Sequence, residues 1–138
     1  MGLYLCVFDE DEELEGLEVG TYEYFGMFRD CINELVEKRN DWGSICPTLL
    51  LHYDCDGKWE TEDCRSLINE IQIIERSFKN LSASSKMMDC KKDLFNLYGI
   101  YPTNLYDCFI DVDGENLIKR LNDLCKFAVS RNLAILFQ

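Results

Sequence analysis

Residues 3–8 have the sequence Leu-Tyr-Leu-Cys-Val-Phe, an apolar run near the start of the chain. This pattern is typical of a strand whose sheet is covered on both faces, whereas a half-exposed strand alternates apolar and polar residues. Residues 48–53 (TLLLHY) and 133–137 (LAILF) have the same character, and 106–112 (YDCFIDV) is a weaker candidate. The sequence therefore predicts three or four buried strands.

Between these runs, the spacing of apolar residues changes to that of amphipathic helices. The helical stripes cover residues 25–36, 64–78, 87–98 and 117–129. Alternation of strands and helices favours an α/β fold, with α+β as the alternative. We expect a small, largely parallel sheet of three or four strands, packed by about four helices. A chain of 138 residues is long enough to bury a core, so we expect residues 1–138 to form a single domain.

The charge balance excludes several classes of function. The chain carries 26 acidic and 14 basic residues, which gives a formal net charge of −12. Nucleic acids and anionic membranes require a basic protein surface, so neither is expected as a partner. The 8 cysteines contain no Cys-x-x-Cys pair and lie mostly in apolar runs, which favours reduced thiols. With no apolar run of membrane-spanning length and no basic segment before residues 3–8, we expect a cytoplasmic protein.

Acidic residues gather at three places: after the expected strands at 3–8 and 48–53, and around the candidate strand at 106–112. Loops that follow parallel strands meet at the carboxyl edge of a sheet, so we expect the three clusters to converge there. Such a surface would attract a basic protein partner, and Trp59 would either anchor that interface or cap the core. The alternative is a solvated rim of helix starts, where acidic residues are favoured anyway. The predicted partner-binding residues are Asp9, Glu10, Asp11, Glu12, Glu13, Glu15, Asp54, Asp56, Trp59, Glu60, Asp111, Asp113 and Glu115.

Two Asp-x-Asp-Gly segments, 54–57 and 111–114, suggest an alternative function. Strand-end aspartates of this kind could serve a divalent-metal-binding protein or a small metal-dependent phosphatase-like enzyme. The spacing of a calcium loop is not met, because His52 and Phe109 would occupy the first ligand position of the two segments. His52 is also the single histidine, and its place at a strand end does not make a base–nucleophile pair. The sequence predicts no catalytic residue, no bound metal and no cofactor.

Short stretches spread over nearly the full length of the chain form a recognisable set. They are 1–8 (MGLYLCVF) with the acids that follow, 16–20 (GLEVG), 22–29 (YEYFGMFR), 51–59 (LHYDCDGKW), 109–115 (FIDVDGE) and 134–138 (AILFQ). Together they resemble the immunity protein 70 family of bacterial polymorphic toxin systems. The resemblance implies a non-enzymatic antidote that binds a cognate toxin domain in the producing cell, with no catalytic residues to transfer. An acidic antidote suits a basic toxin, such as a nuclease with a positive groove.

Overall fold

The computed structural model describes residues 2–38, 41–52 and 57–138. Its four strands are β1 (Gly2–Asp9), β2 (Glu12–Thr21), β3 (Lys58–Trp59) and β4 (Ile135–Phe137). They form one sheet in the order β2-β1-β4-β3, and every pairing is antiparallel. The prediction of a largely parallel sheet is therefore wrong, and the fold is α+β. The runs at 3–8 and 133–137 do form strands β1 and β4.

The antiparallel arrangement begins with the connection between β1 and β2. Asp9 pairs with Glu12, so two residues reverse the chain, whereas a parallel crossover needs a dozen or more. The prediction failed here because the glutamates of 12–21 obscure the strand pattern. In the structure, Leu17 and Val19 of β2 are buried in the core while the glutamates of the same strand are exposed.

The apolar run at 48–53 forms helix α2 (Pro47–Leu51) rather than a strand, and residue 53 lies outside the described residues. Pro47 is in the first turn of this helix, where the missing N–H is not needed for an intrahelical hydrogen bond. Leu49 and Leu50 are buried, which accounts for the apolar character that suggested a strand. A short buried apolar run cannot be assigned by periodicity alone.

The weaker strand candidate at 106–112 is also wrong. Its first residues form the 3₁₀ turn η3 (Tyr106–Cys108), and the remainder contributes only a single bridge between Ile110 and Asn116. Asn116 then caps the next helix, because its side-chain oxygen accepts a hydrogen bond from the Lys119 N–H at 2.9 Å.

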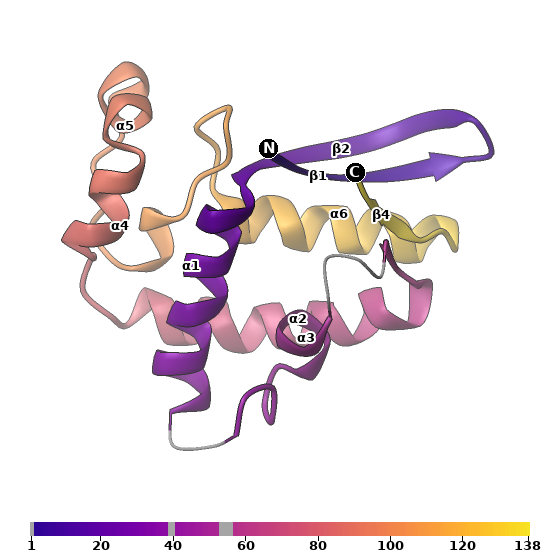
Figure 1. Ribbon diagram of the computed structural model, residues 1–138, viewed down its shortest axis with the longest axis horizontal. Helices are drawn as coiled ribbons and strands as arrows, with labels where there is room; N and C mark the ends of the chain where they lie inside the picture. The colour runs from indigo at the N-terminus through magenta and orange to yellow at the C-terminus, as the bar shows by residue number, and fades with distance from the viewer. Residues whose placement is uncertain (1, 39–40, 53–56) are drawn as a thin grey trace.

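The predicted helical stripes are confirmed. They correspond to α1 (Tyr22–Ile32) with the π-helical turn η1 (Asn33–Glu37), α3 (Thr61–Lys79), the pair α4 (Ser85–Cys90) and α5 (Lys92–Tyr98), and α6 (Leu117–Arg131). Figure 1 shows α6 along one face of the sheet, with α3 running beside it in the opposite direction. The third stripe is divided at Lys91, and α5 ends at Gly99, whose φ of 65° is left-handed.

Lys91 fastens the α4–α5 pair to the rest of the molecule. Its Nζ donates hydrogen bonds to the carbonyl oxygens of Val19 (3.2 Å) and Ile110 (3.1 Å). The same nitrogen lies 4.0 Å from the centroid of the Tyr24 ring, within the range of a cation–π contact. Burial lowers the pKa of Lys91, because the charged ammonium loses water contacts there.

Both edges of the sheet are partly capped by polar groups. On β2, the carbonyl of Gly16 accepts a hydrogen bond from Arg120 (2.9 Å) and that of Glu18 accepts one from the Val112 N–H (3.2 Å). On β3, Nε2 of His52 lies 2.7 Å from the carbonyl oxygen of Lys58. These contacts occupy strand-edge groups that could otherwise pair with another chain.

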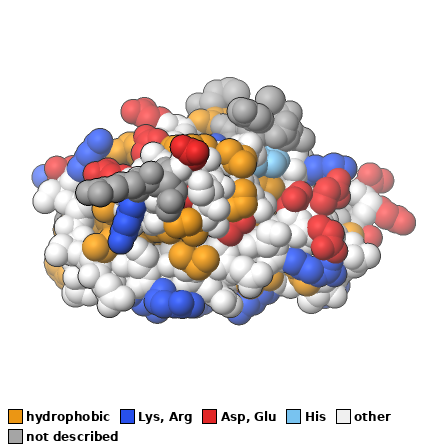
Figure 2. All heavy atoms as spheres, turned by 90° about the horizontal axis from the view of Figure 1, so that it is seen from below, with side chains coloured by type: hydrophobic (Ala, Val, Ile, Leu, Met, Phe, Trp, Pro, Cys, Tyr) orange, Lys and Arg blue, Asp and Glu red, His pale blue; other side chains and the backbone are white. Residues whose placement is uncertain are grey.

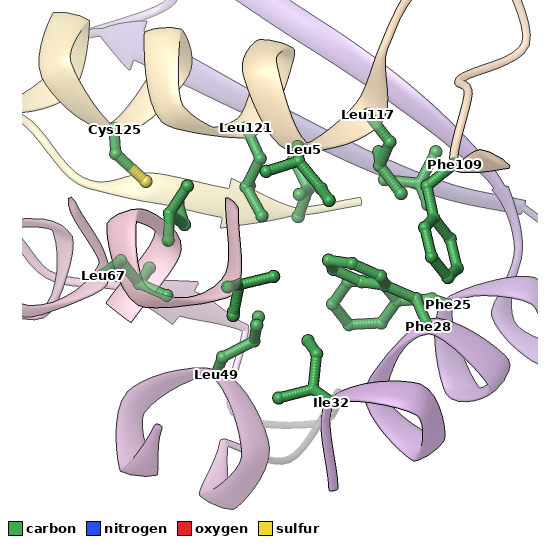
Figure 3. Packing of buried hydrophobic residues seen from close by; sticks show 14 of the residues in the cluster. Leu5, Phe25, Phe28, Ile32, Leu49, Leu67, Phe109, Leu117, Leu121 and Cys125 are labelled. Carbon is green, nitrogen blue, oxygen red and sulfur yellow. The ribbon is translucent and has the colours of Figure 1, made fainter. Parts of the chain in front are cut away.

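The core forms where the sheet meets α1, α3 and α6. Figure 3 shows Phe25 and Phe28 of α1 close to Phe109, with Leu117 of α6 beside them. Phe109 is fully buried, and its ring centroid lies 5.0 Å from that of Phe28 and 5.6 Å from that of Phe78. The segment before α6 is therefore anchored in the core, which fixes the position of residues 110–116.

The glycines of α1 and α5 provide a matched test of these backbone assignments. Gly26 lies inside α1, and a Cβ added there would meet nothing within 4 Å. We expect Gly26→Ala to raise the free energy of unfolding by about 0.5–1 kcal/mol, because alanine loses less backbone entropy on folding. Gly99→Ala should lower it by about 1 kcal/mol, because Gly99 has a positive φ. Urea unfolding measures both, and equal effects of the two variants would contradict the assignment.

Candidate protein-binding surface

The first predicted acidic cluster lies on the β1–β2 hairpin. All six of its carboxylates are exposed, and none forms an ion pair with any Lys or Arg that the structure describes. They are Asp9, Glu10, Asp11, Glu12, Glu13 and Glu15. Glu13 also accepts a hydrogen bond from the Tyr4 hydroxyl, which, with burial, raises the pKa of Tyr4 to about 12. This end of the hairpin is therefore a concentration of negative charge without local neutralisation.

The described part of the second cluster, Glu60, lies at the same end of the sheet as the hairpin turn, and Asp54 and Asp56 fall outside the described residues. β1 and β3 both pair antiparallel with β4, so they run parallel to each other and end at the same edge of the sheet. Glu60 follows β3 directly and caps α3, where its backbone N–H donates to the Asp63 carboxylate at 3.0 Å. In Figure 2, acidic side chains gather at the right-hand end, where Figure 1 places the hairpin turn and the start of α3. We call this surface the acidic end; its described residues are Asp9–Glu13, Glu15, Glu60 and Glu62.

Lys58 and Arg65 reduce the charge of the α3 part of the acidic end. Lys58 lies 3.0 Å from Glu60, and Arg65 pairs with Glu62. These pairs are largely exposed to solvent, so each is worth less than about 1 kcal/mol and leaves its carboxylate accessible to a partner. The hairpin carboxylates, in contrast, have no ion-pair partner among the described Lys and Arg residues.

The third cluster does not join the other two. Asp111 is fully buried, and its Oδ1 accepts hydrogen bonds from the N–H groups of Asp113 and Glu115, both at 2.9 Å. Arg120 of α6 forms an ionic contact with Oδ2 of Asp111 at 3.4 Å and reaches Glu115 at 3.8 Å. Because this loop precedes α6 and bonds to β2 at Glu18, it lies away from the hairpin turn. The expected convergence of all three clusters at a carboxyl edge is wrong, since it depended on a parallel sheet.

Trp59 belongs to the core rather than to an exposed surface. Its side chain is 1% exposed, and its ring packs edge-on against Phe137 with a centroid distance of 4.6 Å. His52 packs beside both rings, 4.6 Å from Phe137 between centroids. Of the two roles expected for Trp59, the structure favours the core. His52, with its Nε2 against the Lys58 carbonyl, has a structural position as well.

The cysteines outside residues 53–56 are free thiols, most of them buried. Burial raises the pKa of the Cys46 thiol to about 12 and that of Cys31 to about 11, so neither is an activated nucleophile at neutral pH. Cys64 of α3 and Cys125 of α6 are both fully buried in the core, and the Cys64 Sγ donates to the Trp59 carbonyl oxygen at 3.9 Å. These residues pack as small apolar groups.

Two buried carboxylates, Glu37 and Glu70, were not among the residues predicted from the sequence. The Glu37 carboxylate accepts hydrogen bonds from the N–H groups of Ile45 (2.5 Å) and Cys46 (3.2 Å), just before α2. Glu70 accepts from Leu49 at 3.0 Å and from Thr48 at 3.2 Å, which satisfies the first N–H groups of α2. The sequence pattern could have indicated that Glu70 is buried, because Glu70 lies on the same side of α3 as Leu67, Ile71 and Ile74. Their hydrogen bonds make them caps of a helix start.

These positions bear on the metal-dependent alternative. Among the residues that the structure describes, no group of three or more His, Cys, Asp and Glu side chains is placed to hold a metal ion. Asp111 is occupied by its own loop and by Arg120. Asp9 is exposed at the hairpin, and residues 54 and 56 are outside the described part. In the part of the chain that the structure describes, no side-chain cluster favours metal chemistry over protein binding.

Comparison with known proteins gives one match. The model of the family described as Immunity protein 70 matches residues 3–137, nearly the whole chain. A search of curated proteins and a search of solved structures found no match. In the described part of the chain, none of the helices combines the length and the apolar character needed to cross a bilayer.

Asp111 and Asp113 form a matched pair for testing the loop before α6. We expect Asp111→Ala to lower the free energy of unfolding by about 2–4 kcal/mol, because it removes a buried carboxylate that accepts from two loop N–H groups and contacts Arg120. Asp113 is exposed, so Asp113→Ala should change stability by less than about 0.5 kcal/mol. Urea unfolding followed by circular dichroism would measure both, and a mild effect at Asp111 would show that the loop is not held by this carboxylate.

Glu70 predicts a specific pH dependence. Burial raises the pKa of Glu70 above its ordinary value. At pH values between the unfolded and the folded pKa, the folded protein therefore keeps a proton that the unfolded chain has lost. Its contribution to stability is therefore present below the unfolded pKa and is lost as pH rises through the folded pKa. Relative to wild type, Glu70→Gln should flatten the fall in stability as the pH rises above about 4.5. Glu75→Gln, on the more exposed face of α3, is the control, and identical pH profiles for wild type and Glu70→Gln would refute the assignment.

Proposed function

The chain belongs to the immunity protein 70 family, and we propose that it binds and neutralises a cognate toxin domain of a polymorphic toxin system. In this role the protein acts by occupying the toxin in the producing cell, and it catalyses no reaction itself. The observation that supports this proposal most strongly is the family match, which covers residues 3–137.

The acidic end is the surface that we propose for the toxin. Its hairpin carboxylates are exposed and lack neutralising partners among the described residues, while β1 is hydrogen-bonded on both sides. The charges are therefore held on a supported strand pair, so little ordering is required when a partner binds. We include Asp54 and Asp56 by their place in the sequence, between α2 and β3. Asp113 and Glu115 lie on a separate acidic loop and form a second, smaller contact region in this proposal.

The chemistry of this surface selects a basic partner. A protein with a net charge of −12 attracts a positively charged domain at long range, which raises the association rate more than the lifetime of the complex. A nuclease domain fits this description, because its substrate groove carries positive charge to hold phosphates. In that case the carboxylates of the acidic end would occupy the groove in place of nucleic acid.

Growth rescue in a heterologous bacterium tests the role itself. The toxin domain encoded beside this gene is expressed alone, with this protein, or with an unrelated acidic protein. We expect growth only with this protein, because neutralisation requires a specific complex. If a domain that kills alone still kills in the presence of this protein, the pairing with that toxin is wrong.

Charge reversal tests the acidic end. We expect Asp11→Lys/Glu12→Lys to slow association with the toxin domain about tenfold or more at low salt and to weaken the dependence of the rate on salt. The control is Asp30→Lys/Glu34→Lys, which makes the same change in net charge at exposed positions of α1 and η1. Stopped-flow or surface-based kinetics measures both. Equal rates for the two variants would show that the toxin binds elsewhere, while the immunity role would still be decided by growth rescue.

A further inference from the structure

The sheet has a second face, opposite the one that packs on the core. Leu3, Leu5 and Val7 of β1 belong to the core, and Figure 1 shows α6 along that face of the sheet. Successive side chains of a strand point to opposite faces, and directly paired residues share a face. The strand pairings therefore place another set of side chains on the far side. We call this set the open face; its residues are Tyr4, Cys6, Phe8, Glu13, Gly16, Glu18, Lys58 and Leu136.

The side chains of the open face form one continuous layer. Tyr4 of β1 reaches across to β2, where its hydroxyl end lies over Gly16, because a Cβ on that glycine would collide with the ring. The same hydroxyl donates a hydrogen bond to Glu13. On the other side of β1, the Cys6 Sγ lies 3.8 Å from the carbonyl oxygen of Leu136. Cys6 is fully buried although it lies outside the core cluster, so its neighbours on this face cover it.

The open face presents apolar side chains to solvent on a rigid support. Tyr4, Phe8 and Leu136 are half-exposed, and none of them belongs to the core cluster. Aromatic residues are enriched at the centres of protein interfaces, where they bury much surface at a small entropic cost. Because β1 is hydrogen-bonded to β2 and to β4, a partner would meet these side chains already ordered.

The charge at the margin of the open face identifies the kind of partner. Glu13 and Glu18 are exposed, and neither forms an ion pair with a Lys or Arg in the described part of the chain. The one basic residue of the face, Lys58, is paired with Glu60 at 3.0 Å. A second copy of this chain or an anionic membrane would bring like charges together here, which is unfavourable. A basic protein surface is the complementary partner.

The arrangement suits arginine and lysine side chains in particular. Their aliphatic stems can lie along Phe8 and Leu136, while their charged ends reach Glu13 and Glu18. The ring of Tyr4 offers a further contact, because a guanidinium group stacks favourably on an aromatic face. Glu13 also belongs to the acidic end, so the open face is continuous with the surface already proposed for the toxin.

We propose that the open face is the contact core of the toxin complex, with Tyr4 and Phe8 as its anchoring side chains and the hairpin carboxylates as its rim. This inference rests on the proposed function and adds a division of labour to it. Rim charges act mainly on the rate of association, whereas anchors buried in an interface act mainly on the lifetime of the complex.

Hydroxyl-radical footprinting of the unmodified protein tests this placement. The probe is the toxin domain that growth rescue pairs with this protein, and mass spectrometry compares side-chain oxidation in the free and the bound chain. Tyr4 and Phe8 should lose reactivity in the complex, because the partner shields them from solvent. Tyr101, which is 86% exposed and follows α5, is the internal control and should stay reactive.

The outcomes of footprinting separate this inference from the proposed function. A stable complex in which Tyr4 and Phe8 stay as reactive as in the free chain would overturn the inference and leave the immunity role intact. If no toxin domain is neutralised and no complex forms, the proposed function is wrong and the inference falls with it.

Single substitutions measure the contribution of the anchors. Tyr4→Ala and Phe8→Ala should each raise the dissociation constant about tenfold or more, through faster dissociation and with little change in the association rate. Charge reversal on the hairpin acts on association instead. Tyr101→Ala, which removes an exposed aromatic ring elsewhere, is the matched control. If both variants keep the wild-type circular dichroism spectrum and dissociate no faster than Tyr101→Ala, the open face is not the contact core.

Discussion

The two-residue turn at Glu10 and Asp11 constrains the arrangement of the whole molecule. It returns the chain directly beside β1, so β2 must run antiparallel and take one side of that strand. Only the other side of β1 remains for β4, which in turn carries β3. The helices then cover the face of the sheet that bears Leu3, Leu5 and Val7. By the same geometry, the acidic residues of the turn lie at one extremity of the molecule.

Charged side chains in this protein serve two physically distinct purposes. Glu70 and Asp111 are buried and use their oxygens to satisfy backbone N–H groups of a helix start and a loop, and Lys91 does the same for carbonyl groups. The hairpin carboxylates are exposed and form no ion pair with a described Lys or Arg, so their charge acts mainly on the solvent side, although Glu13 also accepts a hydrogen bond from the Tyr4 hydroxyl. The net charge counts buried and exposed acids equally. Because few of the 26 acidic residues are buried in the described part of the chain, most of this charge is accessible to a partner.

The sequence was sufficient for the four long helical stripes, for β1 and for β4, because a long apolar stripe has a clear period and Gly99 marks the end of one of them. It was insufficient for β2, whose glutamates hide Leu17 and Val19, and for α2, where a five-residue apolar run has no readable period. The candidate site was predicted in part. The acids after β1 and β3 do lie at the same end of the sheet. Asp111 was predicted to join them because the sheet was expected to be parallel, and strand direction depends on pairing between distant parts of the chain.

The ladder between β1 and β4 has a consequence for how the protein folds. Cys6 and Leu136 are paired across 130 residues of sequence, so this contact carries a large loop-closure entropy and belongs to the class that forms slowly. The contacts between α3 and α6 close a shorter loop, because α3 ends at Lys79 and α6 begins at Leu117. Until the last strand is added, β1 presents open backbone groups flanked by Leu5 and Val7 to other chains. Aggregation during refolding should therefore depend on how quickly residues 135–137 find their place beside β1.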